Sequence, residues 1–227
     1  KKMYITGGIG SRHDGEAFGV NYELPNLTAY NETCAAIGDV YWNHRLHNLY
    51  GKSQYFDVIE RTMYNGLISG ISLDGKQFFY PNALEADGVY KSNRGSCTRQ
   101  GWFDCSCCPT NLIRFIPSIP GLIYSKTNDV LYVNLYASNN ASFQLGKTDL
   151  KISQQTGYPW NGKIGIFWMK PQTQKAHHML MKQAVEHHAG QHHGQRQTDQ
   201  GGGQQTEPQR AGQPSQVPRP VHGTSNR

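Results

Sequence analysis

The sequence lacks the features that mark membrane proteins and small secreted proteins. It contains no apolar run of membrane-spanning length, and its first residues do not form an apolar leader. Its five cysteines are an odd number, and their uneven spacing does not suit a small disulfide-stabilised domain. We therefore expect reduced thiols, a cytoplasmic location and no membrane partner.

Aromatic residues are absent after Trp168. The last part of the chain is instead rich in Gln, His, Gly and Pro, and it contains seven of the ten histidines. Such a composition buries too little apolar surface to offset the entropy lost on ordering, so residues 169–227 are predicted to form a disordered tail. The abrupt loss of periodicity suggests the hypothesis that this tail is a frame-shifted or unrelated translation.

Positive charge is concentrated in the same segment. From Lys170 onward, seven Lys and Arg residues face three Asp and Glu residues, a surplus of four in a net charge of +6. The rest of the chain carries only +2, which is weak support for the basic surface typical of nucleic-acid binding. We expect no nucleic-acid partner, and paired histidines such as His177 and His178 fit a polar tail better than a metal site.

Helical patterns occupy three segments of the first half of the chain. Residues 28–49 carry an imperfect apolar stripe, and Gly51 follows as a stop signal. A second helix is predicted from a Ser53 cap to about residue 68, which makes the tight antiparallel hairpin found in all-α barrels. After a loop-rich stretch over residues 74–108, a third helix is predicted to start at Pro109. The apolar face of the second helix includes Phe56, Ile59, Met63, Leu67 and Ile68, and the third helix carries the apolar residues Leu112, Ile113, Phe115 and Ile116.

The apolar period changes to two after Gly121, which is typical of strands. The predicted strands and turns are strands over 130–136, 141–145 and 148–152, with turns at Asn139-Asn140 and Gly146-Lys147. Helices followed by strands indicate an α+β chain or two domains.

Cysteines and one glutamate are the candidates for a metal site. Cys105, Cys107 and Cys108 lie within four residues, and adjacent cysteines form a disulfide only under strain. Upstream, Glu32 and Cys34 offer a carboxylate and a further thiolate. Zinc prefers four such donors in a tetrahedron, so the sequence favours a metal site here.

The spacing of Glu32 and Cys34 sets a condition on the backbone. Residues two apart on a regular helix point about 200° apart, so the two side chains cannot reach one ion from within a helix. We therefore predict an irregular or extended backbone over residues 31–34, with the regular helix starting just after it.

The same residues have simpler interpretations. Glu32 also suits a solvated helix start, Cys34 a small core residue, and Glu16 an exposed loop acid. No functional role is assigned to Cys97, Cys105, His13, His44 and His47, and the histidines are interpreted as structural.

Five motifs occur in a fixed order along the chain. They are YITGGIGS at 4–11, GEAFG at 15–19, YELPN at 22–26, YNETCA at 30–35 and CSCCPTN at 105–111. Any one motif is weak, but over about residues 3–165 the ordered set closely resembles glycoside hydrolase family 127, the β-L-arabinofuranosidases.

The resemblance implies a fold. In that family an (α/α)6 barrel is followed by β-sandwich domains, so the chain is expected to be mainly α with a β part. Residues 1–121 would be the C-terminal portion of the barrel, and residues 122–168 would be the start of the sandwich.

The resemblance also implies a reaction, the retaining hydrolysis of terminal β-L-arabinofuranosides. Cys107 matches a zinc-bound nucleophile, Glu16 the general acid/base, and Tyr80 a tyrosine that contacts the sugar. The implied partner is an arabinofuranoside-containing glycan or oligosaccharide, and the implied cofactor is Zn2+. The matching zinc ligands are Glu32, Cys34, Cys107 and Cys108.

A second class of function competes with hydrolysis, namely a catalytically inactive zinc-binding fragment with a structural role only. A hydrolase needs Glu16 and Cys107 within reach of a closed pocket. A structural site needs four satisfied ligands and no access for a substrate.

Overall fold

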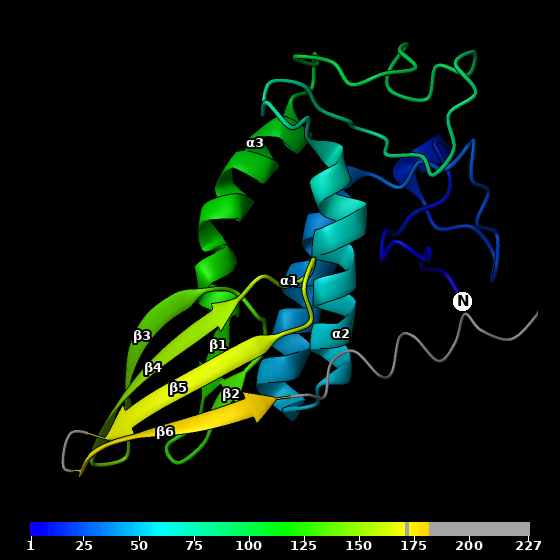
Figure 1. The fold of residues 1–227 in the computed structure, drawn as a ribbon. Coiled ribbons are helices and arrows are strands. Elements are labelled where there is room, and N and C mark those ends of the chain that lie inside the picture. The colour runs from blue at the N-terminus through cyan, green and yellow to red at the C-terminus, as the bar shows by residue number, and fades with distance from the viewer. Residues whose placement is uncertain (171–172, 182–227) are drawn as a thin grey trace, which may run out of the picture. The chain divides into compact units, whose positions relative to one another are not determined.

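The computed structural model describes residues 1–170 and 173–181, in which helices come first and strands second (Figure 1). The helices are α1 (Thr33–Tyr50), α2 (Gln54–Arg61) and α3 (Cys107–Phe115). Short 3-10 or π turns lie at Asp14–Glu16, Thr62–Leu67, Ile68–Gly70 and Ile116–Leu122. The strands are β1 (Tyr124–Lys126), β2 (Leu131–Val133), β3 (Asn139–Leu145), β4 (Thr148–Thr156), β5 (Ile164–Lys170) and β6 (Thr173–Met181).

α1 and α2 lie side by side as the predicted helical hairpin (Figure 1). Gly51 ends α1 in the left-handed region, with φ of 66°, and its N–H donates to the carbonyl of His47 at 2.7 Å. The predicted Ser53 cap was wrong, since Ser53 makes no side-chain cap hydrogen bond. Its backbone is already helical, with φ of −61° and ψ of −31°, whereas a capping residue needs an extended backbone.

The second helix reaches as far as predicted, but its last part is not α-helical. α2 passes into the π turn Thr62–Leu67 and then into the 3-10 turn Ile68–Gly70. Ile68, predicted to be buried, is 56% exposed, because the change of helical pitch turns its side chain away from the core. The remaining predicted core positions of this helix are buried, namely Phe56, Ile59, Met63 and Leu67.

The backbone before α1 is irregular, as the ligand geometry required. Asn31 has φ of 45°, and Glu32 is extended, with φ of −62° and ψ of 137°. The prediction was wrong for Thr33 and Cys34, which already belong to the first turn of α1. One extended residue, Glu32, is enough to turn its carboxylate toward Cys34, so the thiol needs no irregular backbone of its own.

α3 begins at Cys107, two residues earlier than predicted, and the proline lies inside its first turn. Leu112 and Phe115 are fully buried. The other two apolar residues that the sequence gives to this helix are largely exposed, Ile113 at 59% and Ile116 at 44%. Each follows a buried residue by one position, which is a rotation of about 100° around the helix.

Two antiparallel sheets follow, the hairpin β1–β2 and a four-stranded sheet in the order β3–β4–β5–β6. The turn at Gly146-Lys147 joins β3 to β4 as predicted. The turn predicted at Asn139-Asn140 was wrong, because these residues begin β3 and pair with β4. Pairing with a neighbouring strand overrides their turn propensity. The strand predicted over residues 130–136 is shorter than expected, as β2.

The expectation of disorder from residue 169 onward was wrong for part of the segment. β5 continues to Lys170, and β6 spans Thr173–Met181. β6 pairs along β5, with His177 opposite Trp168. Backbone hydrogen bonds to an existing sheet edge depend little on side-chain composition, so a polar segment can add a strand there. The rest of the predicted tail, residues 182–227, lies outside the described residues.

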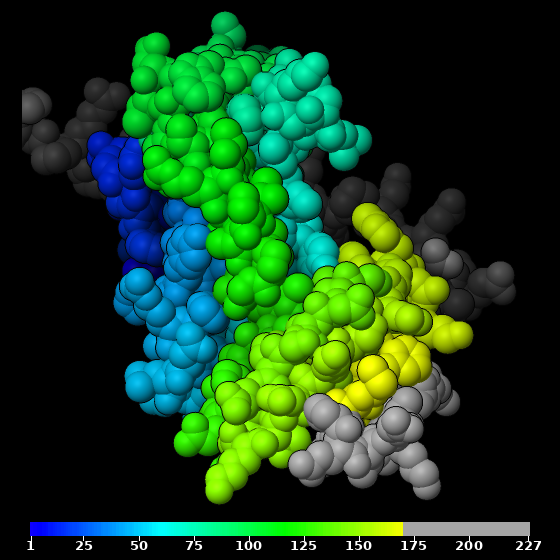
Figure 2. Space-filling model, turned by 90° about the vertical axis from the view of Figure 1, so that its left-hand side faces the viewer, coloured from blue at the N-terminus to red at the C-terminus, as the bar shows by residue number. Residues whose placement is uncertain are grey.

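Two apolar cores support this arrangement. One is formed by the helices together with loop residues such as Phe78 and Phe103, and a smaller one lies on the four-stranded sheet around Ile152, Ile164 and Ile166. Figure 2 shows the residues around α3, in green, at the surface above the strands. Within the described ranges, no helix is both long and apolar enough to cross a bilayer.

Candidate active site and metal centre

The four predicted zinc ligands lie together. One donor atom from each of Glu32, Cys34, Cys107 and Cys108 falls within 4.8 Å of every other. Glu32 directly precedes α1, Cys34 is in its first turn, and the adjacent cysteine pair opens α3. The site therefore lies where two helices begin, and it joins segments more than 70 residues apart.

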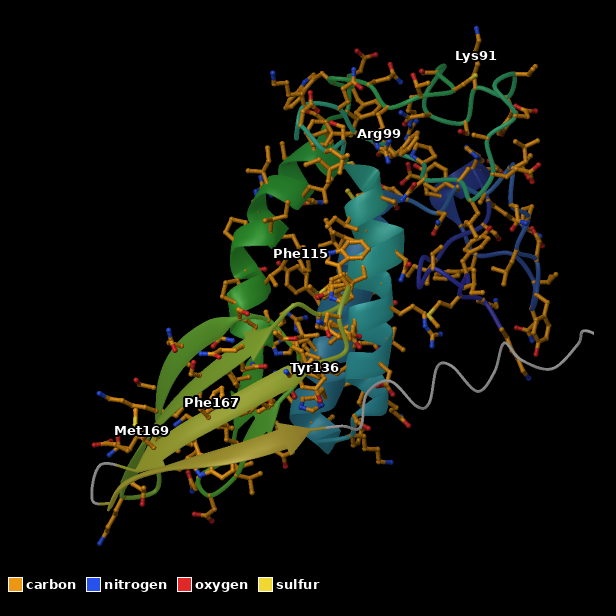
Figure 3. All side chains as sticks on the ribbon, in the orientation of Figure 1. Lys91, Arg99, Phe115, Tyr136, Phe167 and Met169 are labelled. Atoms are coloured by element: carbon orange, nitrogen blue, oxygen red, sulfur yellow. The ribbon has the colours of Figure 1, made fainter. Side chains whose placement is uncertain are left out.

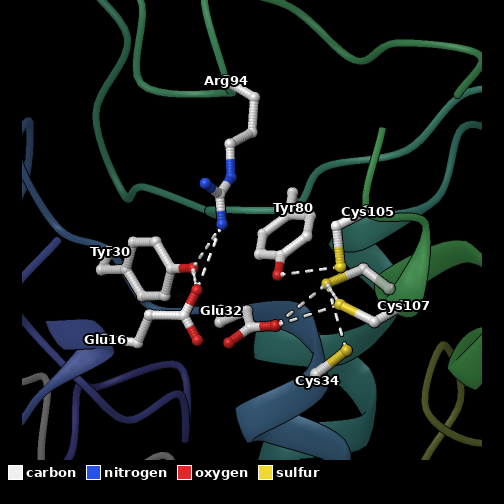
Figure 4. A network of polar contacts seen from close by, with 9 residues as sticks. Glu16, Tyr30, Glu32, Cys34, Tyr80, Arg94, Cys105 and Cys107 are labelled. Carbon is white, nitrogen blue, oxygen red and sulfur yellow. Dashed lines mark hydrogen bonds and ion pairs between the residues drawn. The ribbon is translucent and has the colours of Figure 1, made fainter. Parts of the chain in front are cut away.

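The contacts within this cluster are short. The Sγ of Cys108 lies 3.2 Å from the Sγ of Cys34 and 3.4 Å from Oε1 of Glu32. The Sγ of Cys107 lies 3.6 Å from the same carboxylate oxygen and 3.9 Å from the Sγ of Cys108. Figure 4 shows Cys34 and Cys107 of this cluster together with Glu32.

The protonation of the three thiols differs within the cluster. The hydrogen bond between the Cys34 and Cys108 thiols lowers the pKa of the Cys34 thiol. The same bond, together with burial, raises the pKa of Cys108, and burial raises the pKa of Cys107 to about 12. Cys34 is therefore more readily ionised than Cys107 and Cys108, and a bound cation would favour the thiolate form of the other two. Three thiols and a carboxylate are a donor set that fits zinc.

Asn111 is a contact that the sequence did not single out. Its Nδ2 donates to the Sγ of Cys34 at 3.1 Å. Helical spacing could have indicated this contact, because Asn111 lies one turn after Cys107 and Cys108 and so shares their face of α3. A donor aimed at a metal-binding sulfur stabilises the thiolate form.

Glu16 lies next to this cluster and is held by two donors. The hydroxyl of Tyr30 donates to its Oε1 at 2.5 Å, and Nη2 of Arg94 donates to the same atom at 3.1 Å. The Glu16 side chain is 50% exposed, and its backbone φ of 51° is rare for a residue with a Cβ. The carboxyl group is thus both accessible and fixed. Sequence reasoning missed both partners.

Tyr80 lies between the two groups in Figure 4. It is only 4% exposed, and its hydroxyl is 4.0 Å from the Sγ of Cys105. Burial raises the pKa of the Tyr80 hydroxyl, with the hydrogen bond to Cys107 as the next cause. Cys105, to which no role was assigned, therefore contacts the site.

The interpretation of the helix histidines as structural is confirmed for His47. Its ring nitrogens bond to the carbonyl of Lys52 at 3.2 Å and to Oγ of Ser125 at 3.1 Å. Its ring also packs edge-on against Phe56, with centroids 4.6 Å apart. His47 thus ties the helical hairpin to β1 and is committed to packing.

Comparison with known proteins agrees with the motif set. A family model described as the β-L-arabinofuranosidase, GH127 catalytic domain, matches residues 1–121 of the 227. The chain belongs to glycoside hydrolase family 127. The resemblance read from the sequence is thereby confirmed.

Family 127 relatives share both sequence and fold with this chain. A non-reducing end β-L-arabinofuranosidase of Bifidobacterium longum subsp. longum is 40% identical over 170 residues, covering 72% of this chain and 25% of that protein. A solved GH127 β-arabinofuranosidase is 60% identical, with a TM-score of 0.68, and covers 73% of this chain and 25% of that chain. A GH127 β-L-arabinofuranosidase from Geobacillus stearothermophilus T6 is 44% identical, with a TM-score of 0.72 and coverages of 75% and 28%.

These matches also set the scale of the chain. It spans about a quarter of the length of each of these relatives. The mixed arrangement of helices followed by sheets agrees with the solved structures of the family over that portion.

Proposed function

We propose that this chain supplies the reacting groups of a retaining glycoside hydrolase that removes terminal β-L-arabinofuranosides from glycans or oligosaccharides. The observation that carries the proposal is the gathering of Glu16, Tyr80 and the thiol cluster in one region (Figure 4). Family membership supplies the reaction class, and the clustering supports the assignment of roles to these side chains.

Retention needs one group that attacks the anomeric carbon and one that protonates the leaving oxygen. We assign the first role to Cys107 and the second to Glu16. The Sγ of Cys107 forms a bond to the anomeric carbon as the glycosidic C–O bond breaks, and the leaving oxygen takes the proton of Glu16. Glu16 then takes a proton from water, whose oxygen displaces the sulfur from the anomeric carbon.

A zinc ion held by Glu32, Cys34, Cys107 and Cys108 would keep the thiols ionised at neutral pH. This role fits the raised pKa of Cys107, which without a cation would leave the thiol protonated. Tyr80 is assigned to the sugar, since its ring lies between the proposed acid/base residue and the thiols in Figure 4.

We further propose the family architecture for this portion. Residues 1–121 would be the C-terminal portion of an (α/α)6 barrel, and residues 122–168 the start of a β-sandwich. The helical hairpin α1–α2, its shared core with α3, and the change to antiparallel sheets after residue 122 support this division.

The test combines zinc content with release of p-nitrophenol from p-nitrophenyl β-L-arabinofuranoside. Cys107→Ala should abolish turnover and lower the zinc content. Glu16→Gln should lower turnover, because the water that displaces the sulfur loses its base, even though p-nitrophenolate leaves with little help. The matched controls are Cys97→Ala, a half-buried thiol outside the cluster, and Glu85→Gln, an exposed carboxylate. Both controls should keep the activity of the parent chain. Turnover in Glu16→Gln at the rate of the parent chain, or an equal loss in Glu85→Gln, would refute the assigned roles.

An inactive zinc-binding fragment is the second candidate, because four donor groups within 4.8 Å of one another also suit a purely structural metal site. The same experiment separates the two. Bound zinc that depends on Cys107, with no turnover in the parent chain, would identify the fragment as a metal-binding portion only.

A further inference from the structure

Arg94 contacts three residues of the site but has no role in the function proposed above. Its Nη2 donates to Oε1 of Glu16 and to the hydroxyl of Tyr30, both at 3.1 Å. Its guanidinium carbon lies 4.2 Å from the centroid of the Tyr80 ring. One side chain thus joins the proposed acid/base residue to the proposed sugar-contacting residue (Figure 4).

The contacts to Glu16 distinguish its two oxygens. Tyr30 and Arg94 both donate to Oε1. In the part of the chain that the structure describes, Oε2 has no such partner. A carboxyl group held through one oxygen presents the other in a fixed direction, which is the arrangement that proton transfer to a substrate oxygen requires.

The backbone around Arg94 is built to hold this side chain. Arg94 has φ of 50°, a conformation that costs free energy for a residue with a Cβ and persists only where the surroundings enforce it. The preceding residue, Asn93, is fully buried and supplies that enforcement. Its Oδ1 accepts from the N–H of Tyr80 at 2.8 Å, and its Nδ2 donates to the carbonyls of Phe78 and Thr98 at 3.1 and 2.9 Å.

We propose that Arg94 is a positioning residue for the reaction. It fixes Glu16 through Oε1, so that Oε2 is directed to the glycosidic oxygen. It also packs on the ring of Tyr80, so that one side chain positions both the proposed acid/base residue and the proposed sugar-contacting residue. The buried Asn93 accepts a hydrogen bond from the backbone of Tyr80 and directly precedes Arg94, so it holds the Arg94 backbone in a fixed position relative to Tyr80. This inference rests on the proposed function of Glu16.

The variants for the test are Arg94→Met, which removes the charge and keeps the length, and Arg94→Lys as the conservative rescue. The first control is Lys91→Met, an exposed cation of the same loop (Figure 3). The second is Arg99→Met, which removes a loop anchor, since Arg99 donates to the carbonyl of Ser69 at 2.7 Å and does not touch Glu16.

The first readout is the ratio of kcat/KM for an alkyl and a p-nitrophenyl β-L-arabinofuranoside. A poor leaving group needs the proton of Glu16, whereas p-nitrophenolate leaves with little help. Arg94→Met should therefore lose about tenfold more activity on the alkyl substrate, a fraction of what general acid catalysis contributes. Arg94→Lys should recover part of this difference. Arg99→Met should lower kcat/KM by the same factor on both substrates, and Lys91→Met should leave kcat/KM unchanged on both.

The second readout needs no turnover. It is the rate at which a water-soluble carbodiimide and an amine label Glu16, followed by peptide mass spectrometry. Arg94→Met should raise this rate about threefold, the size expected for loss of a half-exposed ion pair, and both controls should leave it unchanged. If the parent chain has no turnover, the proposed function fails for this chain and labelling alone decides the role of Arg94. An unchanged labelling rate, or an equal loss on both substrates, would overturn the proposal.

Discussion

The Sγ atoms of Cys34 and Cys108 lie 3.2 Å apart, although 74 residues separate them in the sequence. Each cysteine belongs to the first turn of a helix, α1 for Cys34 and α3 for Cys108. The packing of these two helices therefore assembles the donor set, and disruption of either helix start should disperse it.

Cys108→Ser should weaken zinc binding by more than about 100-fold, beyond the loss usual for an outer partner of a metal site. The reason is that Cys108 is fully buried and contacts both Cys34 and Glu32. Competition with a chromophoric chelator measures the affinity. Cys97→Ser is the control and should bind zinc like the parent chain; an equal affinity in Cys108→Ser would remove this residue from the ligand set.

Asn111→Ala should weaken zinc binding about 10- to 100-fold while leaving all four ligands in place. The variant removes the hydrogen bond that Nδ2 donates to the Sγ of Cys34 at 3.1 Å. The same chelator competition measures the change. Asn48→Ala, an exposed amide on α1, is the matched control, and similar affinities in the two variants would show that the contact has no effect on the metal.

Leu112→Ala should lower the free energy of unfolding by about 2–5 kcal/mol, because Leu112 is fully buried and its truncation leaves a cavity. The neighbouring variant Ile113→Ala should change it by less than about 0.5 kcal/mol, since Ile113 is 59% exposed. Urea denaturation at an unchanged m-value is the measurement. Equal losses in this pair would mean that α3 is rotated from the orientation described.

Gly7→Ala should destabilise the chain more than Gly75→Ala. Both glycines have positive φ, 83° and 73°, so both variants carry the backbone strain of about 1–2 kcal/mol. At Gly7 the added Cβ would also meet Oγ1 and Cα of Thr62, at 2.3 and 2.8 Å, whereas nothing lies within 4 Å at Gly75. The additional clash should lower the free energy of unfolding by a further amount of about 1–3 kcal/mol. Urea denaturation of the two variants measures the difference, and a Gly7→Ala variant as stable as Gly75→Ala would contradict the close approach of the π turn.

The candidate donors were visible in the sequence because their chemistry is local and unusual, whereas the choice of four ligands without Cys105 came from the resemblance to family 127. Adjacent cysteines resist pairing with each other, and the two-residue spacing of Glu32 and Cys34 required an irregular backbone, which the structure has at residues 31–32. The order of helices before strands was also visible, since the apolar period changes from helical to twofold after Gly121.

Other features were decided by long-range contacts that a single sequence does not reveal. Tyr30 and Arg94 lie 14 and 78 residues from Glu16, and no periodicity connects the three. The turn propensity of Asn139 and Asn140 lost to pairing with β4. β6 likewise depends on an edge that β5 offers, and its own composition predicted no order.

The closeness of Cys34 and Cys108, at the starts of two helices, also has a consequence for the conformational entropy of the unfolded chain. A metal ion that bridges Cys34 and Cys108 would act as a cross-link across a loop of 74 residues. By analogy with a disulfide closing a loop of this length, such a link restricts the unfolded chain by about 4 kcal/mol. The ion that ionises the thiols would thus also fasten the intervening segment, from the helical hairpin to the Arg94 loop, so that chelation would loosen the region around Glu16 as well as the sulfur cluster.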